Sequence, residues 1–185
     1  ACLAFLNTME LVAMMLERGQ IDYALVVDGE HSRTVQEATL DRIANTPIDM
    51  AGFRAQFATL TLGSGSAAAL LCRMDQHPDA HRLVGGVARA GTEHHTLCIG
   101  DLEAMYTDTH ALLIAGLDLA EAAWKNAGGD FDWEAGMDWY IVHQVSSVHT
   151  RLLCERLGID HNRAPQTFPT NGNVGPAAIP MTLAK

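Results

Sequence analysis

A short apolar run that leads directly into a helical pattern constrains the fold of this chain more than any other stretch. Residues 139–142 read WYIV, which predicts a buried β-strand. Ser146 or Ser147 can cap the helix that follows, and its apolar residues recur at helical spacing until Gly158 ends the pattern. His143 then stands at the carboxyl end of a buried strand, which is where open α/β sheets bind ligands. We therefore expect His143 to be a functional residue rather than a core histidine.

Helical and extended patterns alternate along the rest of the chain, which indicates an α/β fold. Apolar residues recur at helical spacing over 3–18 with further apolar residues between them, so this helix is expected to be buried on most sides and to end at Gly19. The expected strands are a fully buried one at Tyr23–Val27 and further ones within 59–73, at His81–Ala90 and at Ala164–Phe168. A surface excursion at 31–57 (with one helical turn at 35–43) and a loop at 91–106 are expected between them. A long helix should run from Thr107 or Asp108 to Ala127, where Gly128 and Gly129 end it.

Composition and charge argue against several classes of function. The chain has 185 residues, enough for one domain with a core, and its net charge of −10 argues against a role in binding nucleic acid. Charged residues interrupt each apolar run before it reaches the length of a membrane span. The four cysteines show no CxxC or disulfide-framework spacing, which indicates a reducing, cytoplasmic compartment. The nine histidines lack carboxylate partners at ligand spacing, so no metal site is expected.

Two further residues are candidates for chemistry, and each has an ordinary structural alternative. Cys2 stands at or just before the first turn of the predicted helix over 3–18, where a helix N-terminus lowers the pKa of a thiol. An inert buried thiol is the alternative at that position. Asn173 belongs to a strong turn signal, Asn171-Gly172-Asn173, that directly precedes a helical pattern. A structural turn asparagine is the alternative there.

Three segments, in order, resemble the ketoacyl synthase III enzymes of the thiolase superfamily. Residues 1–30 (ACLAFLNTMELVAMMLERGQIDYALVVDGE) resemble the nucleophile helix and the strand after it. The segment HQVSSVHTRLLCERLGI resembles the His-Gln strand-to-helix unit of the family, and NGNVGPAAIP resembles its Gly-Asn turn. Within the superfamily, two segments are similar in sequence to the OleA type: QFATLTLGSGSAAALL and HQVSSVHTRLLCERLGIDHNRAPQTFP. Enzymes of the OleA type join two fatty acyl-CoA molecules head to head in bacterial olefin and β-lactone pathways.

The resemblance implies a fold and three catalytic residues. The fold would be the layered αβαβα arrangement of thiolases, with residues 1–80 forming the end of its first half and residues 81–185 most of its second half. Cys2 would be the nucleophile that takes an acyl group from CoA as a thioester. His143 and Asn173 would donate hydrogen bonds to the thioester carbonyl of the second acyl donor and stabilise its enolate.

The same resemblance implies the reaction and its alternatives. The expected reaction is a non-decarboxylative Claisen condensation of two long-chain acyl-CoAs to a 2-alkyl-3-oxoalkanoate, with Ser146 and Gly172 among the substrate-binding residues. Ketoacyl synthases III usually carry an asparagine in the place of Ser146, and this difference weakens the first alternative, decarboxylative condensation with a malonyl-carrier protein. The second alternative is a non-catalytic subunit that supports a catalytic paralogue; the presence of all three catalytic residue types argues against it.

Partners and cofactors follow from the resemblance as well. The family works without a resident cofactor, so acyl-CoA is expected only as a substrate. The family forms homodimers, and the same is expected here. Family members are roughly twice as long as this chain, so we expect a missing N-terminal half to be required for activity, because it carries the glutamate that serves as base in the OleA type.

Overall fold

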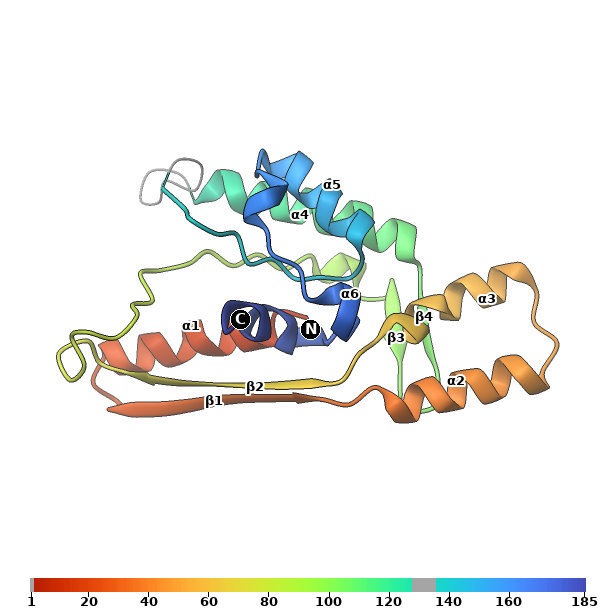
Figure 1. Ribbon diagram of the computed structural model, residues 1–185, viewed down its shortest axis with the longest axis horizontal. Coiled ribbons are helices and arrows are strands. Elements are labelled where there is room, and N and C mark those ends of the chain that lie inside the picture. The colour runs from red at the N-terminus through yellow and green to blue at the C-terminus, as the bar shows by residue number, and fades with distance from the viewer. Residues whose placement is uncertain (1, 128–135) are drawn as a thin grey trace.

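The computed structural model describes residues 2–127 and 136–185, and it contains helices and strands in mixed order (Figure 1). The predicted stop of the long helix at Gly128 and Gly129 lies outside the described residues. The α-helices are α1 Ala4–Glu17, α2 Arg33–Asn45, α3 Met50–Gln56, α4 Thr109–Asn126, α5 Ser147–Leu157, α6 Phe168–Asn171 and α7 Ala178–Leu183. The strands are β1 Tyr23–Glu30, β2 Gly65–Cys72, β3 Cys98–Gly100 and β4 Met105–Thr107, and short 3₁₀ helices are η1 Phe57–Thr61, η2 Thr92–His94, η3 His161–Arg163 and η4 Gly175–Ala177.

The strands β1 and β2 form an antiparallel pair whose two faces differ in burial. Their register runs from Tyr23 opposite Cys72 to Glu30 opposite Gly65. The helices α1 and α7 and the short helix η4 lie against this pair (Figure 1), and Val26 on β1 is only 4% exposed. Successive side chains of a strand point to opposite faces. Leu25 and Val27, the neighbours of Val26, are accordingly 64% and 65% exposed, so only one face of the pair is covered.

The helices α4 and α5 pack together as a second layer (Figure 1). Arg156 of α5 reaches both Asp118 and Glu121 of α4, at 2.9 Å and 2.6 Å. Below the helices, an apolar cluster contains Tyr140 and Cys154, together with Ile159, Ala164 and the half-buried Trp124, Met137 and Leu157. This cluster ties the chain around residue 140 to the α4–α5 layer.

The caps of α4 and α5 confirm the sequence predictions. Asp108 precedes α4 and accepts a hydrogen bond from the backbone N–H of Ala111 at 2.9 Å. Ser146 precedes α5 and accepts one from the backbone N–H of His149 at 3.1 Å. Gly158 ends α5 with a φ of 70°, a left-handed conformation that glycine adopts without strain. Local side-chain chemistry therefore fixes where these helices begin and end.

Several predicted elements are wrong. Residues 139–142, His81–Ala90 and Ala164–Phe168 belong to no strand, and the last of these instead runs into α6. A strand requires a hydrogen-bonded neighbour, and the backbone N–H of Tyr140 donates to the carbonyl of Arg163 at 2.8 Å without continuing into a ladder. The expected loop at 91–106 contains β3 and most of β4, which pair antiparallel. The first helix is less buried than expected, since Phe5 and Leu16 are its buried residues.

The segment 31–57, expected as a surface excursion, forms the two helices α2 and α3. Polar contacts rather than an apolar stripe hold α2 in place. The side chain of Gln36 donates to the carbonyl of Leu62 at 2.8 Å, and Arg42 donates to the side chain of Gln56 at 2.8 Å. A helix held in this way carries little of the hydrophobic periodicity on which sequence prediction depends.

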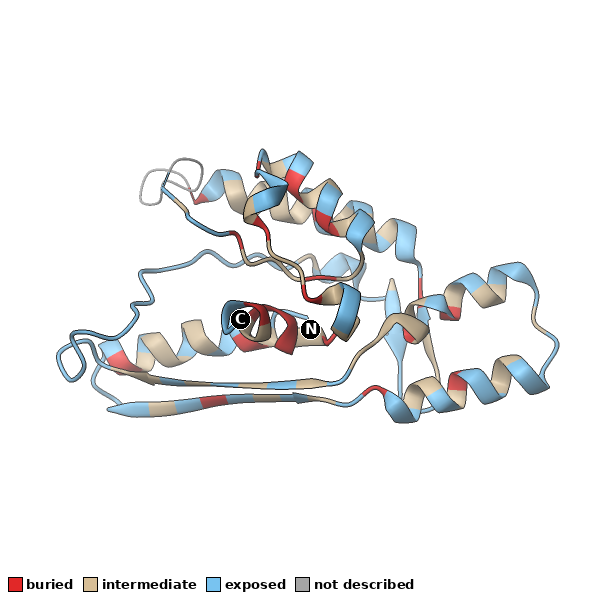
Figure 2. Cartoon of the chain, viewed as in Figure 1, coloured by how far each residue is buried: buried red, intermediate tan, exposed pale blue. Residues whose placement is uncertain are grey.

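Several of the buried side chains among the described residues gather in the last helical segment (Figure 2). Val174, Ala177 and Ala178 are 1%, 0% and 1% exposed and pack with Met181. These small side chains allow η4 and α7 to approach β1 and β2 closely. In the part of the chain that the structure describes, no helix is both long and apolar enough to cross a membrane.

Gly63 provides a test of the contact between the end of the chain and the entry to β2. A Cβ atom at Gly63 would lie 1.8 Å from the carbonyl oxygen of Asn171, so Gly63→Ala forces backbone to move and should lower the free energy of unfolding by about 2 kcal/mol or more. Gly116 of α4 is the matched control, because a Cβ there meets nothing and alanine favours a helix by about 1 kcal/mol. Chemical denaturation measures both, and equal effects at the two glycines would contradict the packing described.

Candidate active site

His143 lies in the extended chain immediately before the Ser146 cap of α5. Both ring nitrogens are buried, and neither has a hydrogen-bond partner among the described residues. Burial lowers the pKa of His143 to about 4, and the neighbouring His149 contributes to the shift. The imidazole is therefore neutral at pH 7 and carries one N–H that no described residue uses. A buried neutral imidazole of this kind can donate a hydrogen bond to a ligand without carrying a charge.

Gln144 follows His143 and is 1% exposed. Its Oε1 accepts from the backbone N–H groups of Thr167 and Phe168 at 2.7 Å and 2.9 Å. Its Nε2 donates to the carbonyl of Pro165 at 3.3 Å and to the hydroxyl of Thr182 at 3.1 Å. Sequence reasoning gave Gln144 no role. Its position beside His143, at a junction expected to be buried, was the sequence signal for a structural role, because a buried amide must form hydrogen bonds within the fold.

Asn173 occupies a turn that is hydrogen-bonded on both sides to the entry of β2. Its backbone N–H donates to the carbonyl of Thr61 at 2.9 Å, and its carbonyl accepts from the N–H of Gly63 at 2.8 Å. Its side-chain Oδ1 accepts from the N–H of Gly175 at 3.1 Å. This last bond fixes the orientation of the amide, so the NH₂ group points elsewhere and donates to no other described residue.

Gly172 is required by the geometry of this turn. Its φ is 71°, and a Cβ atom would lie 2.9 Å from the carbonyl oxygen of Thr61. Ser146, the other residue expected to bind substrate, uses its hydroxyl oxygen to cap α5. Gly172 thus serves the turn and Ser146 serves the helix cap. Contact with a substrate stays a prediction for each.

Cys2 is exposed and precedes Leu3, the residue that caps α1. The thiol is crowded by protein atoms, and this loss of solvation raises its pKa; Cys98 and Glu30 nearby raise it further. The prediction of a lowered thiol pKa is therefore wrong for this chain. The reason is that loss of solvation outweighs the stabilisation that a helix N-terminus offers, since Cys2 lies one residue before the cap of α1.

Glu30, at the end of β1, connects the surroundings of Cys2 with the Asn173 turn. Its carboxyl group lies against Gly175, where a Cβ atom would come within 3.2 Å of its Cδ. Burial and the Asp28 carboxylate raise the pKa of Glu30, and Glu30 in turn raises that of Cys2. Because Glu30 ends β1, lies against Gly175 of η4 and influences Cys2, the Asn173 turn and Cys2 lie near the same end of the sheet. Sequence reasoning did not single out Glu30, although a carboxylate at the end of an apolar strand was visible.

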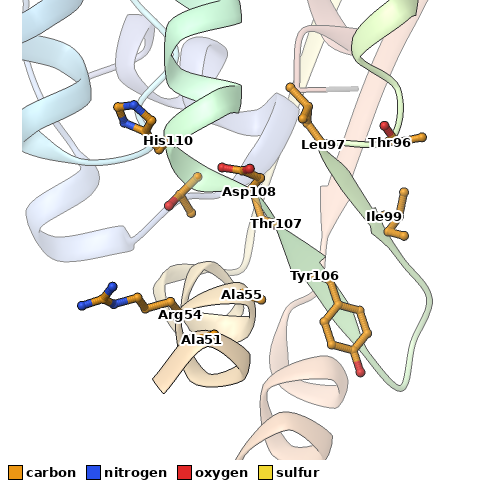
Figure 3. Close-up of a pocket in the computed structure, with 11 residues that line it drawn as sticks. Ala51, Arg54, Ala55, Thr96, Leu97, Ile99, Tyr106, Thr107, Asp108 and His110 are labelled. Carbon is orange, nitrogen blue, oxygen red and sulfur yellow. The ribbon is translucent and has the colours of Figure 1, made fainter. Parts of the chain in front are cut away.

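A pocket among the described residues lies elsewhere. It has a volume of about 410 Å³ and is lined by α3, β3, β4 and the start of α4 (Figure 3). Arg54, Tyr106 and His110 are among its polar residues, and none of the predicted site residues lines it. Nor do the described residues contain a group of three or more His, Cys, Asp or Glu placed to hold a metal ion.

The chain is similar to known proteins both in a family match and in overall sequence. Residues 134–185 match the family described as 3-oxoacyl-[acyl-carrier-protein] synthase III C terminal. The whole chain is 45% identical, over 186 residues, to an acyl-CoA:acyl-CoA alkyltransferase of Xanthomonas campestris, covering 55% of that protein. It is 30% identical to the acyl-CoA:acyl-CoA alkyltransferase of Shewanella oneidensis, covering 56% of it. The chain thus spans about half the length of the curated relatives it matches.

Solved structures agree with the sequence comparison. The fold superposes on Xanthomonas campestris OleA, in a form with a serine in place of a cysteine and with lauric acid and lauroyl-CoA bound, with a TM-score of 0.92 and 44% identity. The match covers 99% of this chain and 55% of that one. Other structures of the same OleA carry replacements at a cysteine, a histidine and a glutamate. The fold described above is accordingly part of a thiolase-like fold, and the chain is similar over its whole length to ketoacyl synthase III-like proteins.

Proposed function

We propose that the whole protein condenses two long-chain acyl-CoA molecules without loss of carbon dioxide, and that this chain supplies the nucleophile and the oxyanion donors. The observation that carries the proposal is the pair of unused neutral donors, the imidazole of His143 and the NH₂ group of Asn173. Neutral donors stabilise a developing oxyanion. The alkyltransferase relatives in Xanthomonas and Shewanella support the choice of acyl-CoA for both substrates.

The first half-reaction is acyl transfer to Cys2. The thiolate attacks the thioester carbonyl of one acyl-CoA, a new carbon–sulfur bond forms at Cys2, and CoA leaves as a thiolate that takes up a proton. Cys2 is an exposed residue although its thiol is partly desolvated, so a substrate can approach it from the surface. Residues 1–80 would thus contribute the nucleophile to the site.

The second half-reaction joins the two acyl chains. A base removes a proton from the α-carbon of the second acyl-CoA, and His143 and Asn173 donate hydrogen bonds to the enolate oxygen. The enolate carbon attacks the Cys2 thioester, and Cys2 leaves as a thiolate. Hydrolysis of the resulting thioester then gives a 2-alkyl-3-oxoalkanoate and CoA. Because the pKa of His143 is about 4, the ring stays neutral at pH 7 and does not protonate the enolate.

In this proposal the base is a glutamate equivalent to one that is replaced in Xanthomonas OleA. In Xanthomonas OleA the replaced glutamate stands further upstream of the replaced cysteine than this chain extends before Cys2. We propose that an equivalent glutamate completes the site.

We also propose that the whole protein is a cytoplasmic homodimer that acts in olefin biosynthesis without a resident cofactor. The uncovered face of β1, with Leu25 and Val27, offers a surface on which further chain or a second copy can pack.

Two alternatives remain, each favoured by a specific observation. The family model matched by residues 134–185 describes synthases that use acyl-carrier protein, which favours decarboxylative condensation with a malonyl-carrier protein. The raised thiol pKa of Cys2 favours a non-catalytic supporting subunit. Release of carbon dioxide identifies the first alternative, and absence of any acyl-enzyme in the complete protein identifies the second.

Replacement of the nucleophile gives the first functional prediction. In the full-length protein, Cys2→Ala should abolish the acyl adduct that forms with a long-chain acyl-CoA, because no other sulfur occupies its place. Cys72→Ala is the control, since Cys72 is a half-buried free thiol outside the site and its loss should leave the adduct unchanged. Intact mass with peptide mapping measures both, and an adduct that maps to the exposed Cys98 would contradict the assignment.

The raised pKa of Cys2 predicts a pH dependence of acylation. The thiolate is the attacking species, so a thiol whose pKa lies above its usual value is mostly protonated at neutral pH. The rate of acylation should therefore rise roughly tenfold per pH unit between about pH 6 and pH 8. Single-turnover kinetics by rapid quench and mass spectrometry follow this directly. A rate that is already independent of pH near pH 7 would show that the thiolate is stabilised after all.

The variant Asn173→Asp distinguishes the role of Asn173 in the turn from its role as a hydrogen-bond donor to the substrate. Aspartate keeps an oxygen for the N–H of Gly175 and so preserves the turn, but it replaces the NH₂ donor with an acceptor. We expect Cys2 acylation to proceed and condensation to fall by roughly 10²-fold to 10³-fold, the usual effect of losing one oxyanion donor. The two half-reactions are measured separately, and a variant that condenses normally would remove Asn173 from the mechanism.

A further inference from the structure

The side chain of Gln144 uses its complete hydrogen-bonding capacity inside the protein. A primary amide has two donor hydrogens and an oxygen with two lone pairs. Pro165 and Thr182 accept from the first group, and the backbone N–H groups of Thr167 and Phe168 donate to the second. The residue is 1% exposed, so water does not compete for these bonds. The hydroxyl groups of Thr167 and Thr182 are also 2.8 Å apart, which closes the network.

This network holds the chain on both sides of Asn173. Thr167 and Phe168 begin the segment that forms α6 and leads into the turn, and Thr182 lies in α7, which follows the turn. Between them the turn is fixed to Thr61 and Gly63 by backbone hydrogen bonds. Gln144 therefore holds the turn at its entrance and at its exit.

Gln144 also restrains the backbone position of His143, because neighbouring Cα atoms in a chain are only about 3.8 Å apart. Once its amide is bonded to four groups, the backbone of Gln144 has little freedom, and the backbone of His143 shares that restraint. His143 itself has no side-chain hydrogen bond to a described residue that would orient its ring. The hydrogen bonds of the Gln144 side chain thus determine where the imidazole lies relative to the Asn173 turn.

We propose that Gln144 is a positioning residue, whose four-bonded amide sets the separation between the His143 and Asn173 donors. The inference rests on the proposed function of those two residues. Two donors stabilise one enolate oxygen only if both lie within hydrogen-bond distance of the same point. Gln144 contacts no reacting atom in this account, and its effect on the reaction is entirely through the placement of its neighbours.

The variant Gln144→Met tests this, because methionine has a similar length and no amide. In the full-length protein we expect kcat for condensation to fall roughly 10²-fold, the effect of a displacement of about 1 Å in an active site. The KM for the second acyl-CoA and the rate of Cys2 acylation should each stay within about threefold of wild type, since neither depends on the enolate donors. A merely structural role would reduce both half-reactions together, in proportion to the folded fraction.

A second variant pair guards against failure of Gln144→Met to fold. Thr182→Val removes the hydroxyl that accepts from Gln144, whereas Thr182→Ser retains it. We expect the valine variant to lose condensation selectively and the serine variant to recover it. Thr150→Val is the matched control: Thr150 is equally buried on α5 and its hydroxyl has no partner among the described residues, so its loss should leave both half-reactions unchanged.

Titration of His143 by NMR gives a readout that does not depend on catalysis. In wild type the pKa of His143 is about 4 because the ring is buried beside His149. If Gln144 holds this segment in place, Gln144→Met should admit water and move the pKa toward 6.5, while Thr150→Val should not. An unchanged His143 pKa together with unchanged kcat in Gln144→Met would overturn the inference. A wild-type protein that never condenses acyl-CoA, yet shows the shifted His143 pKa in the variant, would overturn the proposed function alone.

Discussion

The backbone pairing between the Asn173 turn and the entry of β2 is the constraint on which the arrangement of the site depends. Asn173 exchanges hydrogen bonds with Thr61 and Gly63, and the absence of a side chain at Gly63 lets the carbonyl of Asn171 approach. This contact brings the last part of the chain onto the sheet that follows the nucleophile. The well-buried small residues of η4 and α7 then pack against that sheet. Without this pairing, Cys2 and Asn173 would belong to separate parts of the molecule.

The electrostatics of the site favour neutral groups. Burial keeps His143 uncharged, and the Asn173 amide is neutral by nature. Burial also raises the pKa of Glu30 and of Cys2. A site of this kind stabilises charge when it develops on a substrate oxygen, because buried dipoles that are already oriented act more strongly than water does. It stabilises a resting thiolate less well, which is why acyl transfer is expected to depend on pH.

The sequence predicted the features that local chemistry decides and missed those that distant contacts decide. Asp108, Ser146 and Gly158 mark helix ends by their own side chains or conformations, and all three were predicted. The prediction of a strand at 139–142 was wrong, because a strand forms only where a neighbouring strand pairs with it. Only one helical turn, at 35–43, was expected where α2 forms, because Gln36 and Arg42 hold this helix through polar bonds to residues far along the chain.

The site residues show the same division. His143 and Asn173 were identified through resemblance and their positions in the chain, but the network of Gln144 joins segments that no sequence spacing connects. The pKa of Cys2 was predicted in the wrong direction, because position before a helix does not reveal how far the cap lies from the thiol or what crowds it.

The most direct test of the account is to supply the full-length protein with fully ¹³C-labelled long-chain acyl-CoA as its only acyl donor and to weigh the product by mass spectrometry. Condensation without loss of carbon dioxide gives a 2-alkyl-3-oxoalkanoate that retains every labelled carbon of two acyl chains. A product that forms only when a malonyl-carrier protein is added, with one carbon released as carbon dioxide, would contradict it.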